Sequence, residues 1–183
     1  MKKIALVTGA TSGIGEACAR KLAENGYNMI VTGRRADRLE AVAADLRAVG
    51  AEVLTLVFDV RDREAATAAI QGLPSEWQEI DVLINNAGGA LGLEPEYEGN
   101  YQDWDTMIDT NIKPGLVETN FSVIRFHGDK ERADGVYKGI QPLMGKDIAE
   151  SVYYAVSAPE HVQVAEILIL ATHQASGSVI VRS

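Results

Sequence analysis

The sequence predicts an α/β fold built on a doubly wound parallel sheet, and three observations lead to this prediction. Four short apolar segments alternate with helical patterns over residues 3–88. Each apolar segment runs into glycine, asparagine or charged residues. The intervening patterns have the length of ordinary helices, about 10–15 residues, and strands separated in this way form βαβ units. Such units place their strands in one parallel sheet with right-handed crossovers.

The elements of this fold can be assigned in order along the chain. We expect a first strand over residues 3–8, then a glycine turn and a helix from Gly13 to Glu24, which Asn25-Gly26 ends. The second strand is expected over residues 28–32. The second helix ends at Gly50, and its apolar face is formed by Leu39, Val42, Ala43, Leu46 and Val49.

Strand three is expected over residues 53–58, which are apolar almost throughout, as in a strand buried on both faces. A third helix begins near Asp62 and ends between Gly72 and Pro74, and strand four covers residues 81–84. Further helices are expected over residues 101–113 and 146–157, with a last strand over residues 164–171. The whole chain, residues 1–183, forms one domain by its length.

The residues at the ends of the four strands are those of a nucleotide site. In open α/β sheets, ligands bind beyond the carboxyl ends of the strands. The first of these ends carries glycines that let backbone N–H groups approach a phosphate at a helix N-terminus. The residues concerned are Thr8 to Gly15, Arg34 and Arg35, Asp59, and Asn85 to Gly88.

Arg34 and Arg35 favour NADP over NAD as the cofactor. The end of the second strand meets the adenosine ribose in dinucleotide folds, where an acidic residue selects NAD and arginine accommodates the 2′-phosphate of NADP. Residues 32–35 include no acidic residue. The alternative is that both arginines are solvated charges, but two cations at a helix N-terminus oppose the helix dipole.

Composition and charge exclude several other classes of protein. The net charge of −9 argues against nucleic acid or an anionic membrane as a partner. No apolar run reaches the ~18 residues that span a bilayer, and the apolar run after Lys2-Lys3 breaks too early for a signal peptide. A single cysteine, Cys18, suits the reducing cytoplasm and is expected to be a buried helix residue. No metal site is expected.

Two motifs of the chain resemble those of the classical short-chain dehydrogenase/reductase family. Thr8 to Gly15 is similar to its T-G-x-x-x-G-x-G motif, and Asn85 to Gly88 to its N-N-A-G motif. The resemblance implies a Rossmann-type fold that binds NADP. The residues implied to bind the cofactor are Gly9, Thr11, Ser12, Gly13, Ile14, Gly15, Arg34, Arg35, Asp59, Val60, Asn86, Ala87, Gly88, Pro114, Gly115, Val117 and Thr119.

Within that family, the chain looks most like the NADP-dependent 3-hydroxy acid dehydrogenases, which are similar to serine and malonic semialdehyde oxidoreductases. This resemblance implies a small hydroxy acid or carbonyl substrate, a catalytic role for Asn111, and a lid over about residues 116–144. It also implies a homo-oligomer, a dimer or a tetramer.

The resemblance breaks between Lys113 and Pro114. None of the six tyrosines is followed four residues later by lysine, although the family uses a Y-x-x-x-K pair and a serine. The segment for strands five and six, which holds these residues, is therefore missing at this junction. Either the protein has a segment that this sequence omits, or the chain is truncated. The leading hypothesis is an NADP-dependent oxidoreductase; the alternatives are a catalytically inactive NADP-binding module and a nonfunctional fragment.

Overall fold

A four-stranded parallel sheet is the centre of the computed structural model, which describes residues 2–88, 103, 117–118, 141–167 and 169. The strand order is β3-β2-β1-β4. The chain moves outward from β1 to β3 and then returns across β1 to β4, so the strand order reverses between β1 and β4. The strands are β1 (Ile4–Val7), β2 (Asn28–Gly33), β3 (Val53–Val57) and β4 (Val82–Ile84).

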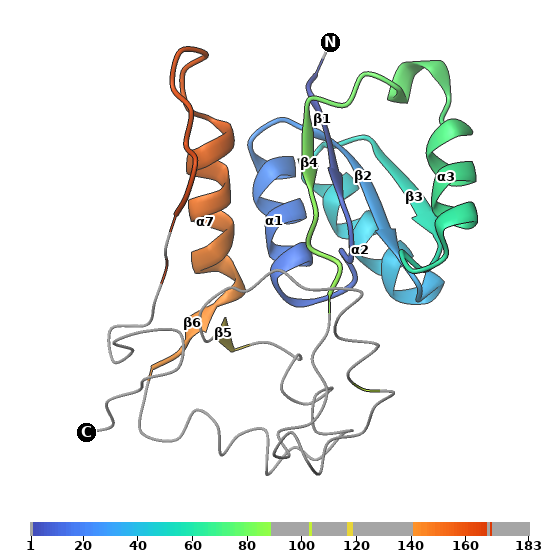
Figure 1. Ribbon diagram of the computed structural model, residues 1–183, viewed down its shortest axis with the longest axis horizontal. Helices are drawn as coiled ribbons and strands as arrows, with labels where there is room; N and C mark the ends of the chain where they lie inside the picture. Colours follow the sequence, from blue (N-terminus) through green and yellow to red (C-terminus); the bar gives the residue numbers. More distant parts are fainter. Residues whose placement is uncertain (1, 89–102, 104–116, 119–140, 168, 170–183) are drawn as a thin grey trace.

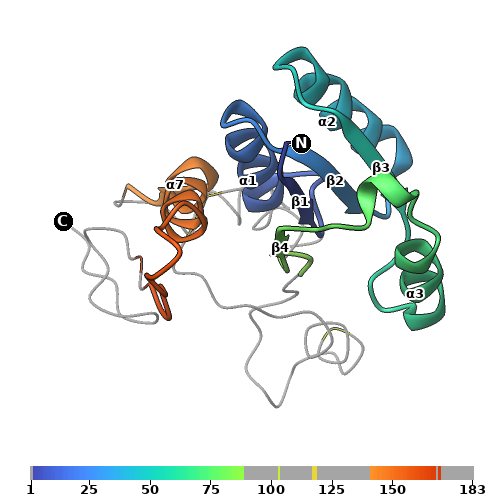
Figure 2. The same cartoon turned by 90° about the horizontal axis from the view of Figure 1, so that it is seen from above.

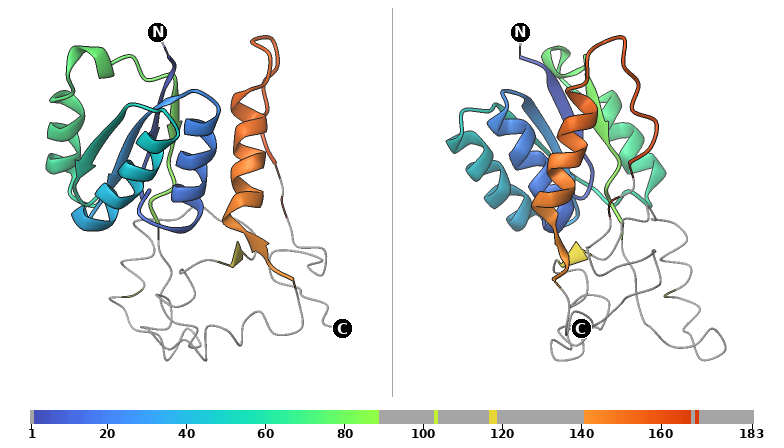
Figure 3. Two further views of the ribbon diagram at one scale, coloured as in Figure 1. Left: turned by 180° about the vertical axis from the view of Figure 1, so that it is seen from behind. Right: turned by 90° about the vertical axis from the view of Figure 1, so that its left-hand side faces the viewer.

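Helices cover both faces of this sheet. Figure 2 shows α1 and α2 on one side of the strands and α3 on the other. Figures 1 and 3 show α7, from the last third of the chain, standing beside α1. The helices are α1 (Gly13–Glu24), α2 (Ala36–Ala48), α3 (Arg63–Gln71), the short 3-10 helix η1 (Ser75–Trp77) and α7 (Gly145–Val156). A separate parallel pair joins β5 (Val117–Glu118) to β6 (Leu143–Met144).

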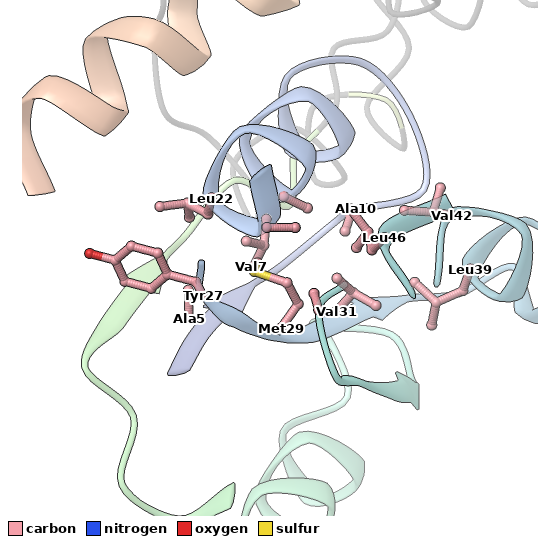
Figure 4. Packing of buried hydrophobic residues seen from close by; sticks show 13 residues of the cluster. Ala5, Val7, Ala10, Leu22, Tyr27, Met29, Val31, Leu39, Val42 and Leu46 are labelled. Carbon is pink, nitrogen blue, oxygen red and sulfur yellow. The ribbon is translucent and has the colours of Figure 1, made fainter. Parts of the chain in front are cut away.

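Alternation along the central strands produces two hydrophobic clusters, one on each face. Met29 and Val31 of β2 face α1 and α2, where Leu39 and Leu46 pack against them (Figure 4). Ile30, between them in sequence, belongs to the opposite cluster with Leu73. Because successive side chains of a strand point to opposite faces, β1 and β2 are buried on both sides. Their positions are thereby fixed, and so are the loops that follow them.

The structure confirms most of the expected elements but corrects two of them. The helix from Gly13 to Glu24 has the bounds that the sequence predicts, and strand two extends one residue further, to Gly33. Strand three is not buried on both faces: Val53 to Leu56 are half-buried and Val57 is 55% exposed, because β3 is an edge strand. Residues 164–167 and 169 are not in a strand, although a last strand was expected there.

A parallel strand requires a hydrogen-bonded neighbour, and this requirement explains why residues 164–167 and 169 are not in a strand. In the part of the chain that the structure describes, β4 pairs with β1 alone, and no strand lies on its other side. Leu83, in the middle of β4, is accordingly 57% exposed. No helix among the described residues has the length and apolar character needed to cross a membrane.

Candidate functional site

The turn after β1 lies in close contact with the loop after β4, and two glycines permit this approach. Gly9 has a φ of +68°, which favours glycine, and a Cβ atom there would lie 2.8 Å from the Cα of Ala87. A Cβ atom on Gly15 would lie 2.5 Å from the carbonyl oxygen of Gly9. The turn therefore places the N-terminus of α1 at the point where the strand order reverses, and a helix N-terminus favours an anion.

Hydrogen bonds between Thr8 and Asn86 lock these two loops together. Thr8 Oγ1 accepts from the backbone N–H groups of Asn86 and Ala87, each at 3.0 Å. The Asn86 side chain donates from Nδ2 to the carbonyl oxygens of Thr8 at 3.0 Å and Gly9 at 3.2 Å. The Asn86 amide group is thus directed at the glycine turn, where it fixes the shape of the loop.

Arg35 reaches back from the start of α2 to the glycine turn. Its Nη2 atom donates to Thr11 Oγ1 at 2.8 Å and lies 3.4 Å from Ser12 Oγ. Gly33 allows this close packing, because a Cβ atom there would lie 2.5 Å from Thr11 Cγ2. A half-buried guanidinium beside two hydroxyl groups has the donors and the charge that a phosphate group requires.

Arg34 points elsewhere, toward Asp59 at the end of β3. Its Nη1 atom lies 3.6 Å from Asp59 Oδ2, and its side chain is 67% exposed. Arg61 contacts the same carboxylate more closely, with 2.7 Å between Nη2 and Oδ2. Hydrogen bonds from Arg61, with a smaller contribution from the charge of Arg34, lower the pKa of Asp59 to about 2. Asp59 is therefore ionised at neutral pH.

The first residue of α7 supports the glycine turn from a distant part of the chain. A Cβ atom on Gly145 would lie 3.2 Å from the carbonyl oxygen of Gly13 and 3.4 Å from the Cβ of Ala17. At the other end of α1, Lys21 Nζ lies 2.6 Å from Glu150 Oε1 and 5.4 Å from the centroid of the Tyr153 ring. These contacts hold α7 along α1.

A cysteine and a lysine–tyrosine pair, both residue types that can take part in catalysis, lie away from the glycine turn. Cys18 is buried in α1, and desolvation raises the pKa of its thiol to about 11, so the thiol is protonated at neutral pH. Lys21 and Tyr153 are neighbours in space, but Lys21 is in the last turn of α1, at the end remote from Gly13. Among the described residues, no group of three or more His, Cys, Asp or Glu side chains could hold a metal ion.

The structure brings most of the sequence-predicted site residues to one edge of the sheet. The glycine turn, both arginines, Asp59 and Asn86 are there, as described above. Ile14 is half-buried in the first turn of α1, and Val60 is half-buried after Asp59. Ala87 contacts the glycine turn, Gly88 is exposed, and Val117 pairs with Leu143 through the backbone. Four predicted positions lie outside the described residues: Asn111, Pro114, Gly115 and Thr119, as does the junction at Lys113. Of the expected helix 101–113, only Asp103 is described, and it is helical.

Sequence reasoning missed two contacts at the candidate site. Arg61 was not included, although its place two residues after Asp59 is close enough for a local ion pair. Gly145 was also missed, because its contact with Gly13 joins segments that are remote in sequence. A glycine at the first position of an amphipathic helix is the one signal that could have indicated close packing there.

Comparison with known proteins identifies relatives along nearly the whole chain. Residues 3–134 match the family described as short chain dehydrogenase. A probable NADP-dependent dehydrogenase of Haemophilus influenzae is 37% identical, over 93% of this chain and 94% of the relative. An NADP-dependent 3-hydroxy acid dehydrogenase of Salmonella typhi is 35% identical, over 88% of this chain and 92% of the relative.

A solved structure of similar fold is the closed form of serine dehydrogenase complexed with NADP+. It is 29% identical, with a TM-score of 0.89, over 98% of this chain and 99% of that one. The match with the Haemophilus influenzae relative extends over 239 positions, which exceeds the 183 residues of this chain. The relative therefore contains internal residues that have no counterpart here.

Proposed function

The chain belongs to the short-chain dehydrogenase/reductase family, and we propose that it is an NADP-dependent oxidoreductase that transfers hydride between NADP(H) and a small 3-hydroxy acid or its carbonyl partner. NADP is the cofactor that the names of its relatives specify. Relatives named for 3-hydroxy acids, and a structural neighbour named serine dehydrogenase, support the class of substrate. The single structural observation that supports this proposal best is the locked glycine turn with Arg35 bonded to its hydroxyl groups.

The residues present fit the proposed cofactor. A Cβ atom on Gly9 or Gly15 would fill the approach between the two loops, and the N-terminus of α1 supplies N–H donors for the pyrophosphate. Arg34 and Arg35 would hold the 2′-phosphate, and Asp59 and Val60 the adenine. Asn86 to Gly88 would keep the loop beside the ribose in position. NADPH, when bound, supplies the hydride; the chain's own contribution at this edge of the sheet is to bind and orient.

The other half of the reaction, proton transfer to the carbonyl oxygen, requires an acid of suitable pKa near the substrate. The family resemblance implies a serine, a tyrosine and a lysine for this task, and we place their segment between Lys113 and Pro114. Asn111 would orient a water molecule for the proton relay. The tyrosines of this chain lack the Y-x-x-x-K spacing, and the pair Lys21 and Tyr153 lies at the wrong end of α1.

A second candidate function follows from the internal residues that this chain lacks. Without the tyrosine and lysine, the chain is an NADP-binding module that does not catalyse hydride transfer. The absence of a Y-x-x-x-K pair from this sequence is the observation that supports this candidate for the 183-residue chain taken alone. We propose that the protein is an oxidoreductase when the missing segment is present.

Three measurements on one preparation separate these functions. NADPH fluorescence on titration tests binding, and loss of NADPH absorbance with malonic semialdehyde tests reduction. Intact mass tests whether the protein is larger than the 19.7 kDa of this sequence. Binding with turnover at a larger mass supports the oxidoreductase, and binding without turnover at 19.7 kDa supports the module. Absence of NADPH binding, or tighter binding of NADH, contradicts both.

We also propose a cytoplasmic homo-oligomer, a dimer or a tetramer, with a small-molecule substrate and no nucleic-acid partner. The proposal of an oligomer rests on family resemblance, and exposed apolar side chains at Tyr154 and Val162 are compatible with a contact there. Sedimentation of the purified protein at several concentrations measures the oligomeric state, and a monomer at every concentration contradicts it.

A further inference from the structure

Three groups of Arg61 contact the Asp59 carboxylate: the backbone N–H, Nε and Nη2. The Arg61 backbone N–H donates to Asp59 Oδ1 at 3.0 Å. Its Nε atom lies 3.1 Å from Oδ1, and its Nη2 atom lies 2.7 Å from Oδ2. The two guanidinium contacts reach both carboxylate oxygens, which is the bidentate geometry that only arginine provides. We call this contact the Asp59 clamp.

The Asp59 clamp lies next to the place where the 2′-phosphate is proposed to bind. Arg34 Nη1 is 3.6 Å from Asp59 Oδ2, so the guanidinium of Arg34 is shared between that carboxylate and any phosphate it contacts. A phosphate held by the same guanidinium would lie within about 8 Å of the carboxylate, which is one Debye length at physiological salt. Salt therefore weakens the repulsion between the two anions but does not abolish it.

Counting charges shows what Arg61 contributes. Arg34 and Arg35 bring two positive charges to the C-terminal end of β2, and ionised Asp59 cancels one of them. A phosphate monoester carries a charge of about −2 at neutral pH. Arg61 restores the second positive charge. The three arginines and Asp59 together therefore balance the charge of the phosphate only when Arg61 is paired with Asp59.

We propose that Arg61 is a specificity-determining residue that neutralises Asp59, so that the site accepts the 2′-phosphate of NADP while Asp59 still faces the adenine. This inference rests on the proposed function, because it concerns the same cofactor site. Arg61 acts through Asp59, so it is a positioning residue and not a direct phosphate ligand. Its effect is on the preference for NADPH over NADH, because NADH lacks the 2′-phosphate.

If Arg61 and Asp59 formed only an ordinary surface ion pair, the effect of Arg61→Ala on cofactor affinity would be different. Exposed salt bridges contribute little to stability, and Arg61 is exposed. A purely structural role therefore predicts at most a small loss of stability and the same loss of affinity for both cofactors. The proposed role predicts a change in the ratio of the two affinities, with the fold intact.

The test is a fluorescence titration of NADPH and of NADH, separately, into Arg61→Ala and the unaltered protein. We expect the ratio of NADPH to NADH affinity to fall roughly fivefold at low ionic strength, the size of an unscreened Coulomb interaction between charges of about −2 and −1 at this separation in water, and by less at physiological salt. Arg61→Lys keeps the charge and should recover part of the ratio. Arg63→Ala is the matched control, because Arg63 is also exposed, lies two residues away and carries the same charge.

A second pair of variants tests whether Arg61 acts through Asp59. In the Asp59→Asn background no carboxylate charge competes for Arg34, so Arg61→Ala should lower the ratio clearly less than it does in the unaltered background. A fall of the same size in both backgrounds would mean that Arg61 acts on the phosphate independently of Asp59, and would overturn the assignment.

The remaining outcomes separate this inference from the proposed function. Normal NADPH binding by the unaltered protein, with the same ratio in Arg61→Ala, overturns the inference and leaves the proposed function standing. An equal fall in Arg63→Ala also overturns it, because the effect is then one of overall charge. Absence of NADPH binding by the unaltered protein overturns the proposed function, and the inference with it.

Discussion

At the scale of single residues, the hydroxyl group of Thr8 is the contact that fixes the candidate site. It accepts two backbone N–H groups of the loop after β4, at Asn86 and Ala87. Valine has nearly the same shape and cannot accept a hydrogen bond. Thr8→Val should therefore cost about 1–3 kcal/mol of unfolding free energy, because a part-buried donor is left without its partner. It should also weaken NADPH binding.

Urea unfolding and NADPH titration measure these two effects. Thr8→Ser is the matched control, since serine retains the hydroxyl group and should remain close to the unaltered protein in both measurements. Equal stability of the valine and serine variants would show that the Thr8 hydroxyl does not hold the loops together.

The sequence predicts which residues gather at this edge of the sheet, because the glycine turn and the Asn85 to Gly88 motif have recognisable spacing. It does not predict which way each side chain points. Asn86 turns its amide toward the glycine turn, and the two arginines separate, Arg35 to Thr11 and Arg34 to Asp59. The direction of each side chain depends on partners that the fold brings together, and the local spacing of residues does not indicate those partners.

At the scale of elements, α7 and α1 form a contact that reaches the site through a single glycine. Gly145→Val places a branched side chain where a Cβ atom alone would lie 3.2 Å from the Gly13 carbonyl oxygen. Overpacking of this kind costs about 1–3 kcal/mol. We expect lower stability in urea unfolding and weaker NADPH binding, because the glycine turn must shift with α7.

Lys146→Val introduces the same side chain at the next position, which is exposed, and should leave NADPH affinity unchanged. If Gly145→Val binds NADPH as tightly as Lys146→Val does, α7 has no influence on the glycine turn.

Element boundaries from β1 to α3 follow closely from hydrophobic spacing and glycine stops, whereas neighbours in the sheet do not. The apolar run at Val53 to Val57 reads as a fully buried strand, but its place at the edge of the sheet leaves Val57 exposed. The run after Val164 reads as a strand and is not one through Ile167, since the structure describes no partner strand beside it. In both cases the outcome depends on pairing, which one segment cannot reveal.

At the scale of the whole molecule, the sheet is asymmetric about β1. In the described part of the chain, two strands lie on one side of β1 and β4 alone lies on the other. Leu83 of β4 is 57% exposed, and an exposed apolar edge strand invites pairing with another strand. The Haemophilus influenzae relative has internal residues that this chain lacks. We expect that residues of this kind would add strands on that side of the sheet.

Inserting the relative's internal segment between Lys113 and Pro114 tests this account. The longer protein should bury Leu83, gain protection of β4 amides from hydrogen exchange, and show a larger urea m-value, because m increases with the surface that unfolding exposes. It should also reduce malonic semialdehyde with NADPH.

The same insertion with its Y-x-x-x-K tyrosine changed to phenylalanine should keep the protection of β4 and lose turnover. Protection without turnover in the unmodified insertion would place the catalytic groups elsewhere. Unchanged exchange at β4 would show that the junction is not at Lys113 and Pro114.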